Sequence, residues 1–223
     1  MYEKAELIVT GDGSHTILLP DPGDTFHSRF GAIAESLHIY INNGFQYAGA
    51  SRERLHILEI GFGTGLNALL TLLESDRSDK EVYYQCLEPY PLPPKLYEKL
   101  NYPYLLGVSR DTLTRLHSCP FNHRTGFGRF TFEKLNQPVE NVILSTNFFD
   151  LVYFDAFGPS FQPGIWKLPV FRKISAAMSV GAVLVTYSAS GQVRRDLGKA
   201  GLMCEKLAGP AGKREITRAE KRK

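Results

Sequence analysis

The amino-acid sequence predicts an α/β fold with a doubly wound, mainly parallel sheet, preceded by an N-terminal hairpin and helix. Two observations lead to this prediction. From residue 56 onward, short apolar runs suited to buried strands alternate with segments of helical periodicity. A glycine-rich turn within residues 57–67 joins the first of these strands to a helix rich in leucine and alanine. Strands that alternate with helices form parallel sheets that are covered on both faces.

The first part of the chain predicts a hairpin and a helix. Apolar and polar residues alternate over 6–10 and 16–19, and an Asp-Gly turn signal lies between the two runs. Apolar residues then recur at helical spacing over 28–43. We expect Ser28 to cap the start of this helix and Asn43-Gly44 to end it.

The remaining elements follow in order along the chain. The expected strands share an apolar or aromatic run that ends in a polar or turn residue, and they cover 56–60, 82–87, 130–135, 150–154 and 182–187, with closing strands near 203–207 and 214–218. The expected helices share apolar residues three or four positions apart, and they cover 65–75, 94–100, 110–117, 165–178 and 191–200, with a short helix near 138–145. The prolines in 89–94 mark a loop.

Composition is that of an ordinary globular protein. The chain has 223 residues, 43% hydrophobic and 22% charged, which fits one domain; we expect residues 1–50 to pack as an extension on a core of residues 51–223. No apolar run approaches the ~18 residues of a membrane helix, and the N-terminus does not resemble a signal peptide. Three widely spaced cysteines and six histidines without ligand spacing indicate neither a disulfide framework nor a metal site. We expect a monomer in the reducing cytoplasm.

Basic residues gather near the C-terminus although the net charge is only +3. The last eleven residues contain six bases, Lys213 and Arg214 among them, and Arg194-Arg195 form another pair. Such a cluster indicates either a solvated face or a surface that contacts phosphates.

The glycine turn is the most informative segment. Gly61, Gly63 and Gly65 alternate, which lets the backbone turn sharply and approach a ligand closely, next to the free N–H groups of the following helix. The dinucleotide fingerprint G-x-G-x-x-G would need glycine where this chain has Leu66. The spacing therefore disfavours a nicotinamide or flavin cofactor and favours S-adenosylmethionine.

Polar side chains end the predicted strands, and the carboxyl ends of parallel strands share one edge of the sheet, where ligands bind. Glu88 ends the second strand, and we expect it to accept hydrogen bonds from ribose hydroxyls rather than lie in solvent. Glu59 precedes the glycine turn; it either braces the turn or meets the methionine end of the cofactor. Asn136 and Gln137 end the third strand.

Asp155 follows a buried strand and is the candidate catalytic residue. A carboxylate there can orient an amine and help to remove its proton, and its alternative role is a helix cap or loop staple. Phe157, Pro159 and Trp166 offer an apolar wall on which a planar base can stack. Ser188 lies in a turn that either lines the target pocket or simply caps the next helix.

These motifs together resemble the methyltransferase part of the MnmC family. The matching pieces are Asp12-Gly13-Ser14, His27-Ser28-x-x-Gly31-Ala32-x-x-Glu35, the turn 59–67, Phe154-Asp155-Ala156-Phe157-Gly158-Pro159 with Pro163-x-x-Trp166, Tyr187-Ser188-Ala189-Ser190-Gly191-x-Val193-Arg194-Arg195, Ala200-Gly201 and Gly212-Lys213-Arg214-Glu215. The resemblance implies a Rossmann-like class I methyltransferase. It would move a methyl group from S-adenosylmethionine, leaving S-adenosylhomocysteine, to the aminomethyl nitrogen of the wobble uridine in the tRNA anticodon.

The resemblance also assigns site residues. The expected cofactor-binding residues are Glu59, Gly61, Gly63, Gly65, Asn67, Glu88, Asn136, Gln137 and Asp155. The expected substrate-binding residues are Phe157, Pro159, Trp166, Ser188, Arg194, Arg195, Lys213 and Arg214. The family ends its third strand in Gly-Asp next to the adenine, whereas this chain has Asn136-Gln137, whose amides can still accept a hydrogen bond from the adenine amino group. No room exists in 223 residues for the flavin domain of the bifunctional members, so we expect no flavin.

Two other functions stay open from the residues alone. The same sheet serves small-molecule amine methyltransferases and aminopropyltransferases, which would not depend on tRNA. A catalytically silent, RNA-binding relative is the other alternative, because of the substitution at Asn136-Gln137.

Overall fold

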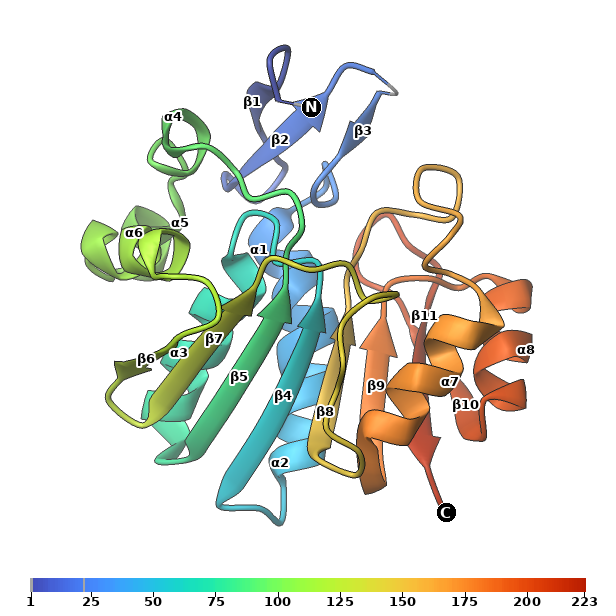
Figure 1. Ribbon diagram of the computed structural model, residues 1–223. Coiled ribbons are helices and arrows are strands. Elements are labelled where there is room, and N and C mark those ends of the chain that lie inside the picture. The colour runs from blue at the N-terminus through green and yellow to red at the C-terminus, as the bar shows by residue number, and fades with distance from the viewer. Residues whose placement is uncertain (1, 22) are drawn as a thin grey trace.

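The core of the protein is an eight-stranded sheet in the order β10-β11-β9-β8-β4-β5-β7-β6 (Figure 1). This computed structural model describes residues 2–21 and 23–223. The parallel strands are β4 (Arg54–Ile60), β5 (Glu81–Leu87), β7 (Phe130–Leu135), β8 (Phe149–Phe154) and β9 (Met178–Thr186). Antiparallel strands complete its edges: β6 (Arg124–Phe127), β10 (Leu202–Ala208) and β11 (Glu215–Lys221). The chain winds outward from β4 in both directions, which confirms the predicted doubly wound, mainly parallel sheet.

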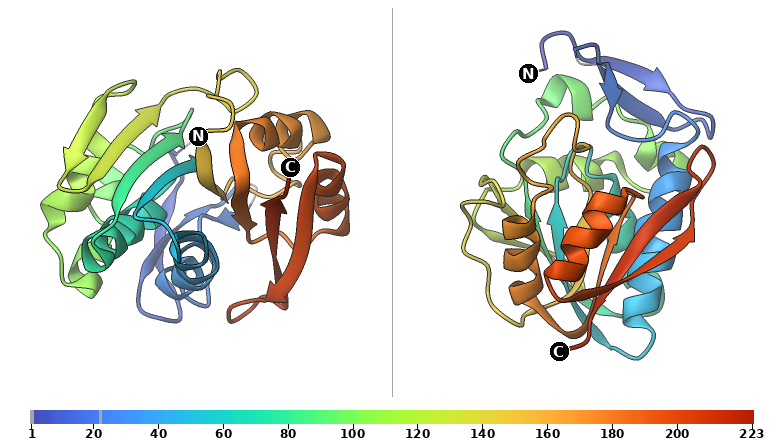
Figure 2. Two further views of the ribbon diagram at one scale, coloured as in Figure 1. Left: turned by 90° about the horizontal axis from the view of Figure 1, so that it is seen from below. Right: turned by 90° about the vertical axis from the view of Figure 1, so that its right-hand side faces the viewer.

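Helices cover both faces of this sheet (Figure 2). On one face lie α7 (Leu168–Ala177) and α8 (Gly191–Lys199), and on the other lies α3 (Leu66–Ser78) beside the long N-terminal helix. Successive side chains of a strand point to opposite faces. Accordingly Leu55 and Ile57 of β4 belong to the core on the α3 side, and Leu58 and Ile60 belong to the core on the α7 side.

A small N-terminal sheet lies above the carboxyl ends of the parallel strands (Figure 1). It pairs β1 (Glu6–Val9) with β2 (His15–Leu19), which confirms the predicted hairpin, and adds the short β3 (Asp24–Thr25). The sheet is attached to the segment that follows β5, because Tyr102 Oη donates to the carbonyl of His15 at 2.7 Å. That segment contains α4 (Pro94–Tyr97), α5 (Tyr102–Leu106) and α6 (Arg110–Ser118).

The long N-terminal helix differs from its prediction at both ends. It consists of α1 (Ala32–Ser36), a π-helical stretch η1 (Leu37–Gln46) and α2 (Tyr47–Gly49), so it begins after Ser28 and continues past Gly44. Ser28 does not cap it; instead its backbone N–H donates to Glu35 Oε2 at 2.7 Å. Gly44 serves close packing, since a Cβ there would lie 3.0 Å from Tyr153 Cε1 and 3.1 Å from Val185 Cγ2. Gly44, which is expected from the sequence to end the helix, therefore lies inside it and packs against the sheet.

The predicted helix near 138–145 is also wrong, because this segment forms turns. Carbonyl groups of this segment accept hydrogen bonds from a lysine on α7. Lys173 Nζ donates to the carbonyls of Val139 at 3.1 Å and Val142 at 3.2 Å, and also to that of Glu140. Strand β6 and helix α5 were not predicted. No helix in the described ranges is long and apolar enough to cross a membrane.

We predict that Gly44→Ala destabilises the protein by about 1–3 kcal/mol, because the added methyl group must displace the Tyr153 and Val185 side chains. Gly198→Ala is the matched control. A Cβ at that helical position meets nothing within 4 Å, so we expect no loss of stability and a gain of up to about 1 kcal/mol. Urea unfolding followed by circular dichroism measures both variants. Equal stability of the two variants would contradict the packing role of Gly44.

Candidate active site

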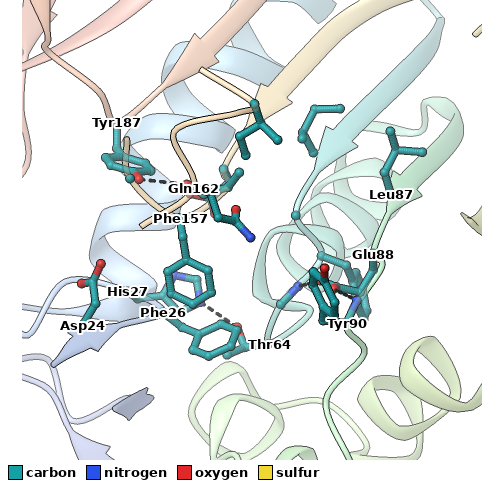
Figure 3. Close-up of a pocket in the computed structure, with 18 of the residues that line it drawn as sticks. Asp24, Phe26, His27, Thr64, Leu87, Glu88, Tyr90, Phe157, Gln162 and Tyr187 are labelled. Carbon is teal, nitrogen blue, oxygen red and sulfur yellow. Dashed lines mark hydrogen bonds between the residues drawn. The ribbon is translucent and has the colours of Figure 1, made fainter. Parts of the chain in front are cut away.

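A cavity of about 570 Å³ lies at the carboxyl edge of the sheet, beneath the N-terminal sheet. Several strand ends contribute to its wall: the turn 61–64 after β4, Glu88 after β5, and Asp155 with Phe157 after β8. Figure 3 shows Phe26, His27 and Phe157 on one side of the cavity, with Glu88 and Tyr90 on another. The topology therefore brings the predicted strand-end residues to one place.

The glycines of the turn after β4 are required by close packing. Gly61, Gly63 and Gly65 have φ angles of 92°, 51° and 74°, which side chains rarely adopt. A Cβ on Gly61 would lie 2.8 Å from the carbonyl oxygen of Asp155, and one on Gly63 would lie 3.0 Å from the Phe26 ring. The turn is thus pressed against both the exit of β8 and the N-terminal extension, and its backbone forms the cavity wall.

Glu88 is held in place by two backbone donors. Its Oε2 accepts from the N–H of Gly63 at 2.9 Å, and its Oε1 accepts from the N–H of Tyr90 at 2.8 Å (Figure 3). Burial raises the pKa of Glu88, and the backbone donors partly offset this rise. Each oxygen keeps a second lone pair, so the carboxylate can accept hydrogen bonds from a ligand in the cavity.

Asp155 is part of a hydrogen-bonded chain. Tyr40 Oη donates to Asp155 Oδ1 at 2.5 Å, and Asn67 Nδ2 donates to Asp155 Oδ2 at 2.7 Å. The same Asn67 amide donates to Glu59 Oε1 at 3.0 Å. Burial raises the pKa of Asp155 to about 7 and holds that of Glu59 well above its ordinary range. Asp155 lines the cavity, whereas Glu59 and Asn67 lie behind it among the described residues.

The expected apolar wall is only partly present. Phe157 lines the cavity and meets Phe26 edge to face at 4.9 Å. Trp166 is buried in the core instead, where its Nε1 donates to the carbonyl of Phe157 at 2.7 Å and supports the wall from behind. Pro159 is exposed and lies outside the described lining.

The end of the third parallel strand also differs from expectation. Asn136 and Gln137 are exposed and do not contribute to the described cavity wall. Residues 138–140 line it instead, because Lys173 draws the backbone of this segment toward α7.

Two of the four basic candidates, Lys213 and Arg214, line a second, more open hollow. It is lined by Tyr187, Ser188, Ala189, Lys206, Lys213, Arg214 and Glu215. Lys213 lines both this hollow and the main cavity. Arg194 pairs with Glu215 at 3.5 Å, while the exposed Arg195 donates to Gln192 Oε1 at 2.8 Å. Neither of these two arginines contributes to the described lining of either space.

Several residues of the site were not predicted from the sequence. Tyr40 lies within an apolar helical run, and nothing in that pattern indicates a carboxylate partner. His27 and Glu35 belong to the motif 27–35 that carries the resemblance, but they are not among the expected site residues. His27 Nε2 lies 2.6 Å from Thr64 Oγ1 of the glycine turn, and burial lowers the pKa of His27 to about 4, so this imidazole is neutral at pH 7 (Figure 3).

Comparisons with known proteins agree with this geometry. A family model described as S-adenosyl-L-methionine-dependent methyltransferase matches residues 123–222. The tRNA 5-methylaminomethyl-2-thiouridine biosynthesis bifunctional protein MnmC of Cupriavidus metallidurans is 32% identical over 97% of this chain, which covers 34% of that relative. The same protein of Aromatoleum aromaticum is 29% identical over 99% of this chain, which covers 36% of it. The crystal structure of MNMC2 from Aquifex aeolicus superposes with a TM-score of 0.79 at 26% identity, over 97% of this chain and 69% of that chain.

The chain is a homologue of the MnmC methyltransferase part. It spans about a third of the length of the curated relatives that it matches. The predicted resemblance to MnmC, the Rossmann-like fold and the class of enzyme, a methyltransferase, are thereby confirmed. Membership of this class implies S-adenosylmethionine as the cofactor. Spermidine synthase from Thermotoga maritima, at a TM-score of 0.60 and 16% identity, shares the fold alone.

Proposed function

We propose that this MnmC homologue transfers a methyl group from S-adenosylmethionine to the aminomethyl nitrogen of a modified wobble uridine in tRNA. The substrate would be 5-aminomethyluridine, with or without the 2-thio group, and the product its methylaminomethyl form. The observation that supports this most is that Asp155 faces the same cavity as the glycine turn and Glu88. We place this reaction in the cytoplasm, with tRNA as the partner of a monomeric chain.

The residues on one side of the cavity fit the cofactor. The backbone at 61–64 forms one wall of the cavity, and Glu88 offers a fixed carboxylate for the two ribose hydroxyls. When bound, S-adenosylmethionine supplies an electrophilic methyl group on a sulfonium. We propose that residues 138–140 lie beside the adenine, because they line the cavity and Asn136-Gln137 do not.

Asp155 is suited to prepare the amine. An alkylamine has a pKa of about 10 and arrives protonated at neutral pH, so it must lose a proton before its lone pair can attack. With a pKa of about 7, Asp155 is ionised in a large fraction of molecules at pH 7 and can accept that proton. Tyr40 and Asn67 fix the carboxylate through one donor on each oxygen, which leaves lone pairs to accept the amine N–H and aim its nitrogen.

Incubation with S-adenosylmethionine labelled in the methyl group tests this function directly. We expect label in tRNA that carries 5-aminomethyluridine and none in tRNA that lacks it. Equal labelling of both tRNAs, or labelling of a free polyamine alone, would contradict the proposal and favour one of the alternatives.

We predict that Asp155→Asn lowers kcat by about 10²–10⁴-fold, because an amide cannot take the proton from the amine. The wild-type rate should fall as the pH drops below about 7, where Asp155 becomes protonated. The variant should lose this inflection near pH 7, and its rate should instead follow the ionisation of the free amine, whose pKa is about 10. Calorimetry with S-adenosylhomocysteine should show unchanged affinity. Asp150→Asn is the control, since Asp150 lies at the opposite end of the same strand and accepts from the N–H of His56. An unchanged pH profile in Asp155→Asn would refute the assigned role.

We predict that Glu88→Gln weakens the binding of S-adenosylhomocysteine about tenfold or more. The charge that strengthens hydrogen bonds to the ribose is lost, and the new amide NH₂ opposes the backbone donors of Gly63 and Tyr90. Glu81→Gln, at the exposed start of the same strand, serves as the control. Calorimetry measures the affinity of both variants for S-adenosylhomocysteine. If Glu88→Gln binds it as tightly as Glu81→Gln does, Glu88 does not contact the cofactor.

A further inference from the structure

An ion pair between Glu35 and Lys213 lies in the wall of the main cavity. Glu35 Oε2 accepts from the backbone N–H of Ser28 at 2.7 Å, and Glu35 Oε1 lies 2.6 Å from Lys213 Nζ. The Glu35 side chain is 7% exposed, whereas the equally short pair Arg54–Glu81 is 76% and 51% exposed. One oxygen of Glu35 is thus fixed by the backbone, and the other faces a cation inside the cavity.

The Lys213 ammonium is held on a second side by an aromatic ring. Its Nζ lies 4.2 Å from the centre of the Tyr187 ring, in the position of a cation–π contact. A carboxylate and an aromatic face together form a site for an ammonium ion. Lys213 comes from the loop between β10 and β11 and also lines the second hollow, so its flexible side chain reaches both spaces.

We propose that Glu35 and Tyr187 form an ammonium subsite for the substrate amine, and that Lys213, which occupies this subsite here, moves toward the second hollow when the amine enters. The proposal rests on the proposed function and deepens it. It gives the amine a docking position in the cavity that Asp155 also lines, and it gives Lys213 a role in sensing the rest of the substrate.

The charges around the cavity favour such an exchange. Of the described residues that line the cavity, Lys213 is the only lysine or arginine. Five others are acidic: Asp24, Glu35, Glu88, Glu140 and Asp155. Removing Lys213 alone would leave Glu35 as a buried, unpaired charge, which is costly. An incoming alkylammonium replaces one cation by another and keeps the balance. It can then give one proton to Asp155, and a remaining N–H of the neutral amine can still donate to Glu35.

In the second hollow the Lys213 ammonium can bind a phosphate group of the substrate. Lys206 and Arg214 also line it, with Glu215 as the acid within reach of Lys206 at 3.6 Å. When the Lys213 side chain turns into this hollow, it lies with Lys206 and Arg214, and three basic side chains together can bind a phosphate of the nucleic acid. A substrate that carries both the amine and a neighbouring phosphate therefore favours the exchange from both sides.

The test measures how well 5-aminomethyluridine and plain uridine, as free nucleosides, inhibit methylation of an anticodon stem-loop RNA that carries 5-aminomethyluridine. We expect the wild type to prefer the amine-bearing nucleoside about tenfold or more. Glu35→Gln should abolish most of this preference. Lys213→Ala should increase it about threefold, because a competing cation is gone, while raising the KM of the RNA by a similar factor or more.

Controls separate these effects from a loss of structure. Lys199→Ala removes a lysine that is paired with Asp196 at 3.9 Å on α8, and it should change neither quantity. The double variant Glu35→Gln/Lys213→Ala leaves no unpaired charge, and it should bind S-adenosylhomocysteine as the wild type does while lacking the amine preference.

Two results would overturn the subsite. One is the absence of an amine preference in the wild type, and the other is a Lys213→Ala variant that is inhibited less by both nucleosides. Failure of the wild type to methylate the RNA would contradict the proposed function instead. In that case direct calorimetry with the two nucleosides would still decide whether Glu35 and Tyr187 select an ammonium.

Discussion

The site depends on the close contact between the turn after β4 and the exit of β8. The N–H of Asp155 donates to the carbonyl of Ile60 at 3.0 Å, and only a residue without a side chain fits at Gly61, next to the Asp155 carbonyl. Asn67, the second residue of the following helix, then donates to the carboxylates at both strand ends. One backbone contact thereby sets the distance between the proposed cofactor surface and the carboxylate that we propose receives an amine.

The N-terminal extension contributes side chains to the site that the sheet itself does not provide. Tyr40, from the π-helical stretch, reaches Asp155, and Glu35 and His27 complete the wall on the same side. These residues precede the sheet in sequence but meet the carboxyl ends of its strands in space. The carboxyl edge of a doubly wound sheet commonly binds nucleotides. We propose that the extension and the loop that carries Lys213 select the second molecule that approaches it.

Much of this arrangement could be predicted from the sequence, because strand ends are fixed by topology. Gly61, Glu88 and Asp155 were expected at one edge, and they line one cavity. Tyr40 was not expected, since its role depends on how a helix packs and not on a local pattern. Trp166 was placed in the wall but is buried behind it, because composition does not show to which side an aromatic residue points. Asn136 and Gln137 do not line the described cavity, because a distant lysine, Lys173, binds the backbone that follows them.

The roof of the cavity joins segments that are remote along the chain. Tyr102 reaches His15 across 87 positions, and Tyr40 reaches Asp155 across 115. Closing such long loops costs chain entropy that only the completed contacts offset. Local unfolding of either the N-terminal sheet or the α4–α5 segment would remove the shared contact from both. We therefore expect these two segments to unfold together while the strands below them stay intact.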